Sequence, residues 1–157
     1  MIELLVVIAI IGVLSSVVLA SLNSARAKAN NARRVADLNQ IRNALELYAT
    51  DNGGNYPSTG GNWRGTTPNC YGTGSDPNTA IPGLVPNYMS VMPQDPKPIL
   101  PSYCYLYLSN GTDYKVLAYG TVEGGTVQPG APNARYRSGC GSAQASYAVY
   151  TPAYSCL

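Results

Sequence analysis

The N-terminal segment of the chain is almost continuously apolar up to Leu22. No side chain from Leu4 to Leu14 is polar, and serines are the only polar residues between Leu14 and Asn23. As a helix, the 19 residues that start at Leu4 would be ~28 Å long, close to the ~30 Å hydrocarbon core of a bilayer. We therefore expect a helix that stays in a membrane. The alternatives are a buried core helix and a cleaved signal peptide, but the apolar region of a signal peptide runs only ~7–15 residues.

The composition changes abruptly after residue 52. All 12 prolines, all four cysteines, 15 of the 16 glycines and 12 of the 13 tyrosines lie beyond this point. The first 52 residues contain no proline and only one glycine, Gly12. Because proline and glycine interrupt helices, this division predicts one long helix joined to a loop-rich head.

The second half of the predicted helix is amphipathic. Its apolar residues recur at steps of three and four: Val35, Leu38, Ile41, Leu45 and Tyr48. This spacing places them on one helical face, which we expect to pack against the head. The helix should end at Asp51–Gly54, because glycine readily adopts the left-handed conformation that terminates helices.

Two pairs of opposite charges lie four residues apart on the polar face of this half. They are Arg33 with Asp37, and Arg42 with Glu46. Pairs at this spacing can stabilise a helix by about 0.2–0.5 kcal/mol each. We expect both pairs to form.

A helix over residues 2–52 would be ~75 Å long. A head of about 105 residues has a radius of gyration near 13 Å and cannot cover such a rod. We therefore expect residues 1–24 to protrude, as a membrane anchor or the core of a filament. Residues 25–157 would form the head, including the amphipathic helix half up to about residue 52.

The head shows two strand patterns, over 103–108 and 114–119, with a third over 146–150. The segment 109–113 between the first two contains Asn110-Gly111, a dipeptide that favours a tight hairpin turn. A small antiparallel sheet burying one face on the second half of the helix predicts the α+β class.

The composition excludes several kinds of chemistry. The chain has no histidine, which removes Ser-His-Asp and Cys-His catalysis and histidine metal ligands. Charged residues make up 11% of the chain and the formal net charge is +2, too weak for a typical nucleic-acid-binding domain. We expect no enzyme activity, no cofactor and no metal. Asp95, and Asp113 near Asn110, are the candidates for a calcium site, but they supply too few oxygen donors.

The 13 tyrosines fit packing and subunit interfaces, because each supplies apolar area with a polar tip. A stacking platform for DNA needs a basic groove as well, and only five of the ten Lys/Arg residues follow residue 52. Binding of DNA or of another surface is left open without a feature that favours it. Asn110-Gly111-Thr112 also fits a glycosylation sequon, although such a triplet is more often simply a turn.

Glu3 is a single carboxylate at the start of the apolar segment. It either lies at the membrane interface, where it favours the positive end of the helix, or pairs with a cation of a neighbouring rod. Four basic residues follow the apolar segment: Arg26, Lys28, Arg33 and Arg34. By the positive-inside rule this cluster would keep its side of the membrane cytoplasmic. We expect it to contact lipid headgroups or simply to form a solvated helix face.

The run Ile2–Leu14 resembles the N-terminal segment of type IV pilins and type II secretion pseudopilins. Residues 47–57 resemble the helix exit of these proteins, and Gly83-Leu84 and 92–96 resemble their following loop weakly. The resemblance implies a type IV pilin-like fold, cleavage of a basic leader by a prepilin peptidase and methylation of the new N-terminus. A removed basic leader would restore an orientation with the head outside the cytoplasm.

The resemblance also implies a role for Glu3, which corresponds to the family's glutamate that pairs with the N-terminal amine of a neighbouring subunit. The usual mature protein has two more residues here, so either two are missing from this sequence or Met1 is a true terminus. The family's helix-breaking proline, which would fall near Ala20, is absent. Gly12, Ser15 and Ser16 could instead loosen the helix. The expected assembly residues are Glu3, Leu4, Leu5, Val7, Ile8, Ile11, Gly12 and Leu14.

The four cysteines are Cys70, Cys104, Cys140 and Cys156, with no close pair that would indicate zinc. Two disulfides in an oxidising compartment fit better, and three connectivities are open. We favour Cys140–Cys156, because many pilins close their C-terminal loop in this way, together with Cys70–Cys104.

The function expected from these features is that of a structural subunit of a type IV pilus-like extracellular filament, or fimbrium, built as a helical homopolymer. Its partners would be other copies, the inner membrane before assembly and the pilus assembly machinery. One alternative is a type II secretion pseudopilin. Another is a membrane-anchored binding protein, such as a cell-adhesion protein, that never polymerises.

Overall fold

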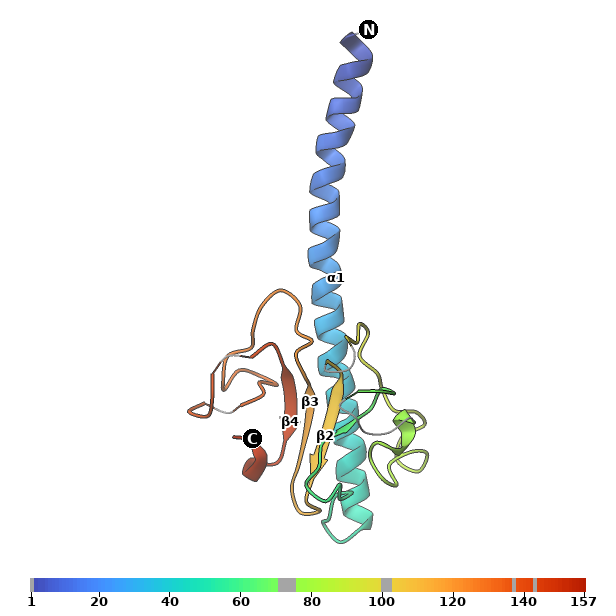
Figure 1. Ribbon diagram of the computed structural model, residues 1–157, viewed down its shortest axis with the longest axis vertical. Coiled ribbons are helices and arrows are strands. Elements are labelled where there is room, and N and C mark those ends of the chain that lie inside the picture. Colours follow the sequence, from blue (N-terminus) through green and yellow to red (C-terminus); the bar gives the residue numbers. More distant parts are fainter. Residues whose placement is uncertain (1, 71–75, 100–102, 137, 143) are drawn as a thin grey trace.

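The computed structural model describes residues 2–70, 76–99, 103–136, 138–142 and 144–157. Figure 1 shows one long helix, α1 (Ile2–Asp51), with the rest of the chain gathered beside its lower half. The strands are β1 (Arg64–Gly65), β2 (Tyr105–Ser109), β3 (Tyr114–Ala118) and β4 (Tyr147–Tyr150). Two short 3-10 helices, η1 (Pro77–Thr79) and η2 (Pro152–Tyr154), lie in the loops. The α+β, pilin-like class expected from the sequence is confirmed. Met1 lies outside the described residues.

Helix α1 runs for 50 residues without interruption. It ends where the sequence predicts: Gly53 and Gly54 have φ of 66° and 83°, and the Gly54 N–H donates to the carbonyl of Ala49 at 2.8 Å. Asn52 closes the last turn from its side chain, because its Nδ2 donates to the carbonyl of Tyr48 at 2.8 Å. The two glycines thus reverse the chain into the head.

The four strands form one antiparallel sheet in the order β1-β2-β3-β4. β2 and β3 form a hairpin in which Tyr105 lies opposite Ala118 and Ser109 lies opposite Tyr114. The three predicted strands are therefore present, each one residue shorter than its pattern, and β2 also begins two residues later and ends one residue later than predicted. β1 adds two residues, with Arg64 opposite Tyr107.

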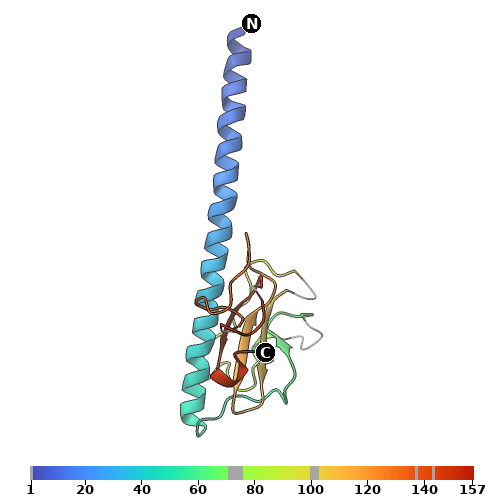
Figure 2. The same cartoon turned by 90° about the vertical axis from the view of Figure 1, so that its left-hand side faces the viewer.

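The sheet is buried on both faces, although the sequence led us to expect burial of one. Figure 2 shows the sheet and loops on one side of α1. The face toward the helix carries Tyr105, Tyr107, Tyr114, Val116 and Val149, which pack with Leu38, Ile41 and Leu45. The opposite face carries Leu106, Leu117 and Ala148, packed with Cys70 and Cys104 under Trp63, Tyr119 and Tyr150. The loops of the head supply this second layer.

The core tyrosines keep their hydroxyl groups bonded. The Tyr105 hydroxyl donates to Asp37 Oδ2 at 2.8 Å, and the Tyr107 hydroxyl donates to the carbonyl of Pro57 at 2.7 Å. The Tyr114 hydroxyl donates to Glu46 Oε1 at 3.1 Å. Tyrosine can therefore build this core where phenylalanine is absent, because each polar tip reaches a partner.

Of the two charge pairs expected on α1, Arg33 and Asp37 lie 3.7 Å apart. The expectation for Arg42 with Glu46 is wrong, because no salt bridge joins them among the described residues. The Glu46 carboxylate instead accepts from the hydroxyl groups of Tyr56, at 3.1 Å, and Tyr114. The two tyrosine hydroxyl groups thus occupy the Glu46 carboxylate, whereas the Arg42 side chain is exposed to solvent.

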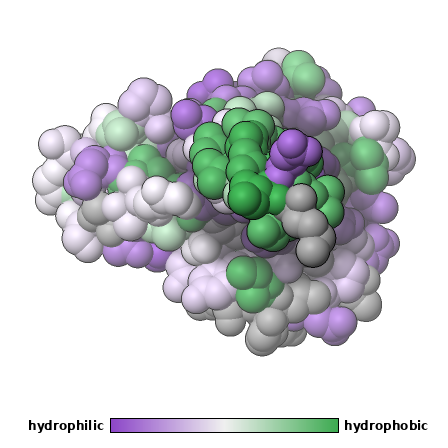
Figure 3. Space-filling view, turned by 90° about the horizontal axis from the view of Figure 1, so that it is seen from above, coloured by the Kyte–Doolittle hydropathy of each residue, from purple (hydrophilic) through white to green (hydrophobic). Residues whose placement is uncertain are grey.

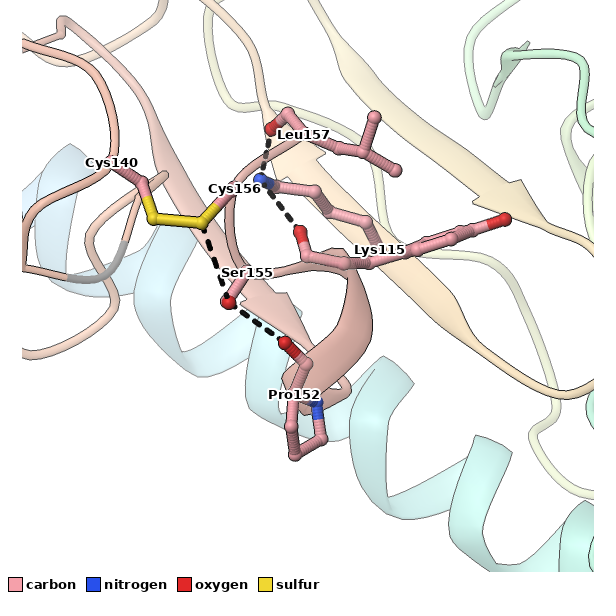
Figure 4. Close-up of a disulfide and its surroundings, with 7 residues drawn as sticks. Lys115, Cys140, Pro152, Ser155, Cys156 and Leu157 are labelled. Atoms are coloured by element: carbon pink, nitrogen blue, oxygen red, sulfur yellow. Dashed lines mark hydrogen bonds between the residues drawn. A yellow bond between two sulfur atoms is a disulfide. The ribbon is translucent and has the colours of Figure 1, made fainter.

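The structure contains two disulfides, Cys70–Cys104 and Cys140–Cys156, with Cα–Cα distances of 6.4 and 5.1 Å. Figure 4 shows the second beside the C-terminal turn, where the Ser155 hydroxyl donates to the carbonyl of Pro152 at 2.7 Å. The Lys115 ammonium points into the same turn and donates to the carbonyls of Tyr154, at 3.2 Å, and Leu157.

Candidate functional site

The upper half of α1 is an apolar rod, which projects beyond the head in Figures 1 and 2. Every residue from Ile2 to Ala25 is exposed. The large apolar side chains are all between 42% and 78% exposed: Ile2, Leu4, Leu5, Val6, Val7, Ile8, Ile10, Ile11, Val13, Leu14, Val17, Val18, Leu19 and Leu22. In Figure 3, which looks down on the molecule, they form a green cluster against a paler and purple head.

This rod has the properties of a membrane or assembly surface. Helix α1 is long and apolar enough to cross a bilayer, and its most apolar window contains no buried residue. Soluble proteins rarely expose apolar patches larger than a few hundred Å². An exposed apolar surface of this kind is stable only when lipid or another apolar surface covers it.

The surface of the rod is grooved rather than smooth. One shallow apolar groove is lined by Val6, Ala9, Ile10, Val13 and Leu14. A second lies further down and is lined by Val17, Val18, Ser21, Leu22 and Ala25. Small residues among large ones create such grooves, into which side chains of another helix can pack.

The predicted assembly residues lie along this rod at its free end. Glu3 is exposed, and among the described residues none forms an ion pair with its carboxylate. Leu4, Leu5, Val7 and the other apolar members are exposed as well. Among the head residues that the structure describes, none covers them, so their role in assembly stays a prediction.

The helix is intact at the residues expected to loosen it. Gly12, Ser15 and Ser16 all lie in regular α-helix. The Ser16 hydroxyl donates to the carbonyl of Val13 at 2.8 Å, which satisfies the hydroxyl within the helix. In the described part of the chain, no atom outside the helix lies within 4 Å of the position that a Cβ of Gly12 would occupy. Loosening at this point also stays a prediction.

The rod is joined to the head through a partly buried polar cluster. Arg34 is 1% exposed, and it binds Asp95 through Nε–Oδ2 and Nη2–Oδ1 contacts of 2.7 and 3.0 Å. Its Nη1 donates to Glu123 Oε1 at 3.1 Å. Asn30 Nδ2 donates to the same Glu123 oxygen at 2.9 Å, and Asn31 exchanges two hydrogen bonds with the Glu123 backbone.

The expectation that Arg34 contacts headgroups or solvent is therefore wrong. Burial lowers the pKa of Arg34, but hydrogen bonds and charges from Asp95 and Glu123 outweigh this and raise it overall. The hydrogen bond from Asn30, together with the nearby Arg34, holds the pKa of Glu123 below its ordinary value. Arg26 and Lys28, in contrast, are exposed.

Asp95 does not have the surroundings of a calcium ligand. Both of its oxygens accept from Arg34, and Oδ1 also accepts from the Lys97 N–H at 2.8 Å. A cation would have to displace a buried guanidinium to reach it. Within the described part of the chain, no three acidic or cysteine side chains are grouped as a metal site.

Two basic residues of the head pack on tyrosine rings of the same chain. Lys115 is buried between the rings of Tyr136 and Tyr150, each 5.0 Å from its Nζ. Arg135 lies over the rings of Tyr119 and Tyr136, and Arg137 is outside the described residues. Cations and rings that are already engaged with each other do not form a stacking platform, so this geometry gives no support to DNA binding.

Three curated proteins resemble part of this chain. Type II secretion system core protein G from Escherichia coli (strain K12) is 42% identical over 59 residues, which are 38% of this chain and 40% of that protein. The proteins of the same name from Pectobacterium carotovorum and Aeromonas hydrophila are 41% and 39% identical over 59 residues, or 37% and 41% of their lengths. The matched part thus spans about 40% of the length of these relatives.

No family model matches the chain, and no solved structure matches it. The resemblance to the type IV pilin and pseudopilin family that was predicted from Ile2–Leu14 is nevertheless confirmed, because these curated relatives are secretion-system proteins of that family. None of them is named as an enzyme.

Proposed function

We propose that this chain is a structural subunit of a helical filament in the cell envelope, and that it polymerises through the apolar rod of α1. The observation that carries the proposal is the exposure of the whole rod beside a head with a well-packed core. In the membrane, lipid would cover the rod. In the filament, rods of other copies would cover it, so that one surface serves both states.

Of the two filaments considered from the sequence, the names of the relatives favour a type II secretion pseudopilus. From the sequence, a pseudopilin was expected only as the alternative to a subunit of a type IV pilus-like filament. The chain would then be held in the inner membrane before assembly, and its partners would be other copies and the secretion machinery. The surface pilus is the second candidate. The head is rich in loops and contains two disulfides, which suits exposure outside the cell.

Glu3 is proposed to set the register of a new subunit by pairing with a cation of its neighbour. A carboxylate inside an apolar environment is tolerated only when it is paired. Processing by a prepilin peptidase and methylation of the new N-terminus belong to the same proposal. Cleavage would free a positive amine that can pair with the carboxylate of an adjacent rod, and methylation would keep this positive charge.

The test combines microscopy with fractionation. Sheared surface material from cells that carry the gene is examined by electron microscopy, with antibody raised against residues 53–157. Label along filament shafts supports a major pilin. Label that stays in the envelope, together with loss of protein export on deletion of the gene, supports the secretion filament. A protein that stays monomeric in detergent and forms no filament in either assay would refute polymerisation and favour an anchored binding protein.

The role of Glu3 has its own matched pair of variants. Glu3→Gln removes the charge and keeps the size, whereas Glu3→Asp keeps the charge. We expect Glu3→Gln to insert in the membrane at normal levels but to impair filament formation, and Glu3→Asp to retain part of it. Normal filament numbers in Glu3→Gln would exclude the pairing role.

A further inference from the structure

The tip of the β2–β3 hairpin holds an exposed Asn-Gly pair in a network of hydrogen bonds. The Oδ1 atom of Asn110 accepts hydrogen bonds from the backbone N–H groups of Thr112, at 2.9 Å, and Asp113, at 2.8 Å. The Asn110 side chain is exposed, and no described residue accepts a hydrogen bond from its Nδ2. The carbonyl end of the amide is thus held, while the nitrogen end is free to leave.

The two N–H groups resemble an oxyanion hole built around a side-chain carbonyl. Donors at 2.7–3.1 Å from an oxygen stabilise the negative charge that develops there when a nucleophile attacks the carbon, an effect worth about 10²–10³ in rate per donor in enzymes. In this hairpin the attacked carbon would be Cγ of Asn110. Both donors are fixed by the turn, so they need no rearrangement.

The nucleophile is the next backbone nitrogen. Gly111 carries no Cβ to obstruct the approach of its nitrogen to Cγ of Asn110. Its N–H donates to Ser109 Oγ at 3.0 Å, which gives the departing proton an acceptor. The carbonyl of Gly111 is held by the Tyr56 N–H at 2.7 Å, and Ser109 is buried at the end of β2.

We propose that Asn110 is a self-modification site, at which the chain converts its own asparagine to aspartate or isoaspartate. The Gly111 nitrogen loses its proton and bonds to Cγ of Asn110, which closes a five-membered succinimide ring. The bond from Cγ to Nδ2 breaks, and this nitrogen leaves as ammonia after taking up a proton. Water then opens the ring at either carbonyl. The step is redox-neutral, needs only water, and does not depend on the proposed function.

The product changes the tip of the head. A new carboxylate appears beside Asp113, and the formal net charge falls from +2 to +1. Where the ring opens to isoaspartate, the backbone gains a methylene group next to the pair of Ser109 and Tyr114 that closes the hairpin. The hairpin tip is at the lower end of the molecule in Figure 1, opposite the free end of the rod.

The chain contains its own control, because Asn52-Gly53 is the same dipeptide and Asn52 is also exposed. There the side chain folds back over the last turn of α1, and Nδ2 donates to the carbonyl of Tyr48. Among the described contacts, no backbone N–H donates to Oδ1 of Asn52. Its leaving nitrogen is bound and its carbonyl is not polarised. Sequence alone predicts equal reactivity for the two pairs, whereas the structure predicts that Asn110 reacts faster.

The test follows both sites in the purified full-length protein in detergent, incubated in mildly alkaline buffer. Peptide mass spectrometry measures the gain of about 1 Da on deamidation, and isoaspartyl methyltransferase labelling detects isoaspartate. We expect Asn110 to react ~30-fold faster than Asn52 in the folded protein, a ratio that corresponds to about 2 kcal/mol from the two hydrogen bonds to Oδ1. After reduction and denaturation the two rates should converge, because only the shared dipeptide remains.

Ser109→Ala removes the proton acceptor and should slow the reaction at Asn110 while Asn52 is unchanged. An unchanged Asn110 rate in this variant would overturn the role of Ser109. A folded-state ratio of one or less would overturn the proposal itself. A glycan on Nδ2 of Asn110 in protein from its own cells would overturn it as well, because that nitrogen could not leave as ammonia.

Discussion

The guanidinium of Arg34 and the carboxylate of Asp95 form a buried two-point contact between α1 and a loop 61 residues further along the chain. The Arg34 side chain is 1% exposed and the Asp95 side chain is 0% exposed. Arg34 lies on α1 just above the apolar residues that pack on the sheet. The pair therefore fixes the point at which the rod leaves the head.

Replacing Asp95 with asparagine should destabilise the head by about 3 kcal/mol, because removing one partner leaves a buried charge without full compensation. Glu123 still contacts Arg34 in this variant, so the effect should stay at the lower end of the range for buried pairs. Urea denaturation of the protein in detergent, followed by tyrosine fluorescence, measures the change.

Arg33→Ala is the matched control. Arg33 is one residue away, but its side chain is 61% exposed and lies 3.7 Å from Asp37. An exposed pair of this kind contributes about 0–1 kcal/mol. Equal losses in Asp95→Asn and Arg33→Ala would contradict the special role of the buried pair.

The helix and the strands could be predicted because their signals are local. The steps of three and four in α1 and the glycines after Asp51 lie within a few residues of one another, and so do the two strands around Asn110-Gly111. Arg34 was missed because its partner is far away in the sequence. One signal was present: Arg34 precedes Leu38 by four residues and Ile41 by seven, which places it on the apolar face.

Other features left weaker signals. β1 has only two residues and no periodicity, so its pairing with β2 depends on tertiary contacts. The sequence does contain a signal for burial of both sheet faces, because Tyr105–Leu108 is apolar at every position rather than alternating. The exposure of the rod could be predicted from the sequence, because the helix is much longer than the diameter of the head.

Tyr105→Phe should cost about 1–2 kcal/mol of unfolding free energy. The Tyr105 hydroxyl donates to Asp37 Oδ2 at 2.8 Å, and its loss leaves a half-buried carboxylate with one donor fewer. Burial raises the pKa of Asp37, and this hydrogen bond opposes the rise. Thermal denaturation compares this variant with Tyr56→Phe, whose hydroxyl contacts Glu46 at the exposed surface. A smaller loss in Tyr105→Phe than in Tyr56→Phe would argue against the prediction.

The stability of the head should rise with pH between about 8 and ~10.4 because of Lys115. Burial, aided by the charge of Arg135, lowers the pKa of Lys115 to about 8, whereas an unfolded lysine has a pKa of ~10.4. Between these two values the unfolded chain binds more protons than the folded chain, so the unfolding free energy increases with pH. Lys115→Met should abolish this increase, and denaturation midpoints measured across this range would show whether it does.

The core tyrosines set an upper limit to the pH range over which the unfolding free energy increases. Burial raises the pKa of Tyr105, Tyr107 and Tyr114 well above the ordinary value. Above a pH of ~10 these tyrosines ionise in the unfolded chain but not in the folded one, so stability falls again. The fall should persist in Lys115→Met. If the unfolding free energy of Lys115→Met still increased with pH, a group other than Lys115 would be responsible for the increase.

The two disulfides should contribute unequally to stability. They close loops of 34 and 16 residues, for which the chain-entropy model gives about 4 and about 3 kcal/mol respectively. Cys70 and Cys104 also pack in the outer core of the sheet, whereas Cys156 is exposed near the C-terminal turn. We therefore expect the double variant Cys70→Ser with Cys104→Ser to lose more stability than the variant of the other pair.

Non-reducing peptide mapping of the native protein must first recover Cys70 with Cys104 and Cys140 with Cys156. A peptide that joins Cys104 to Cys140 would contradict the pairing, and equal losses in the two double variants would show that burial and loop length do not decide the difference.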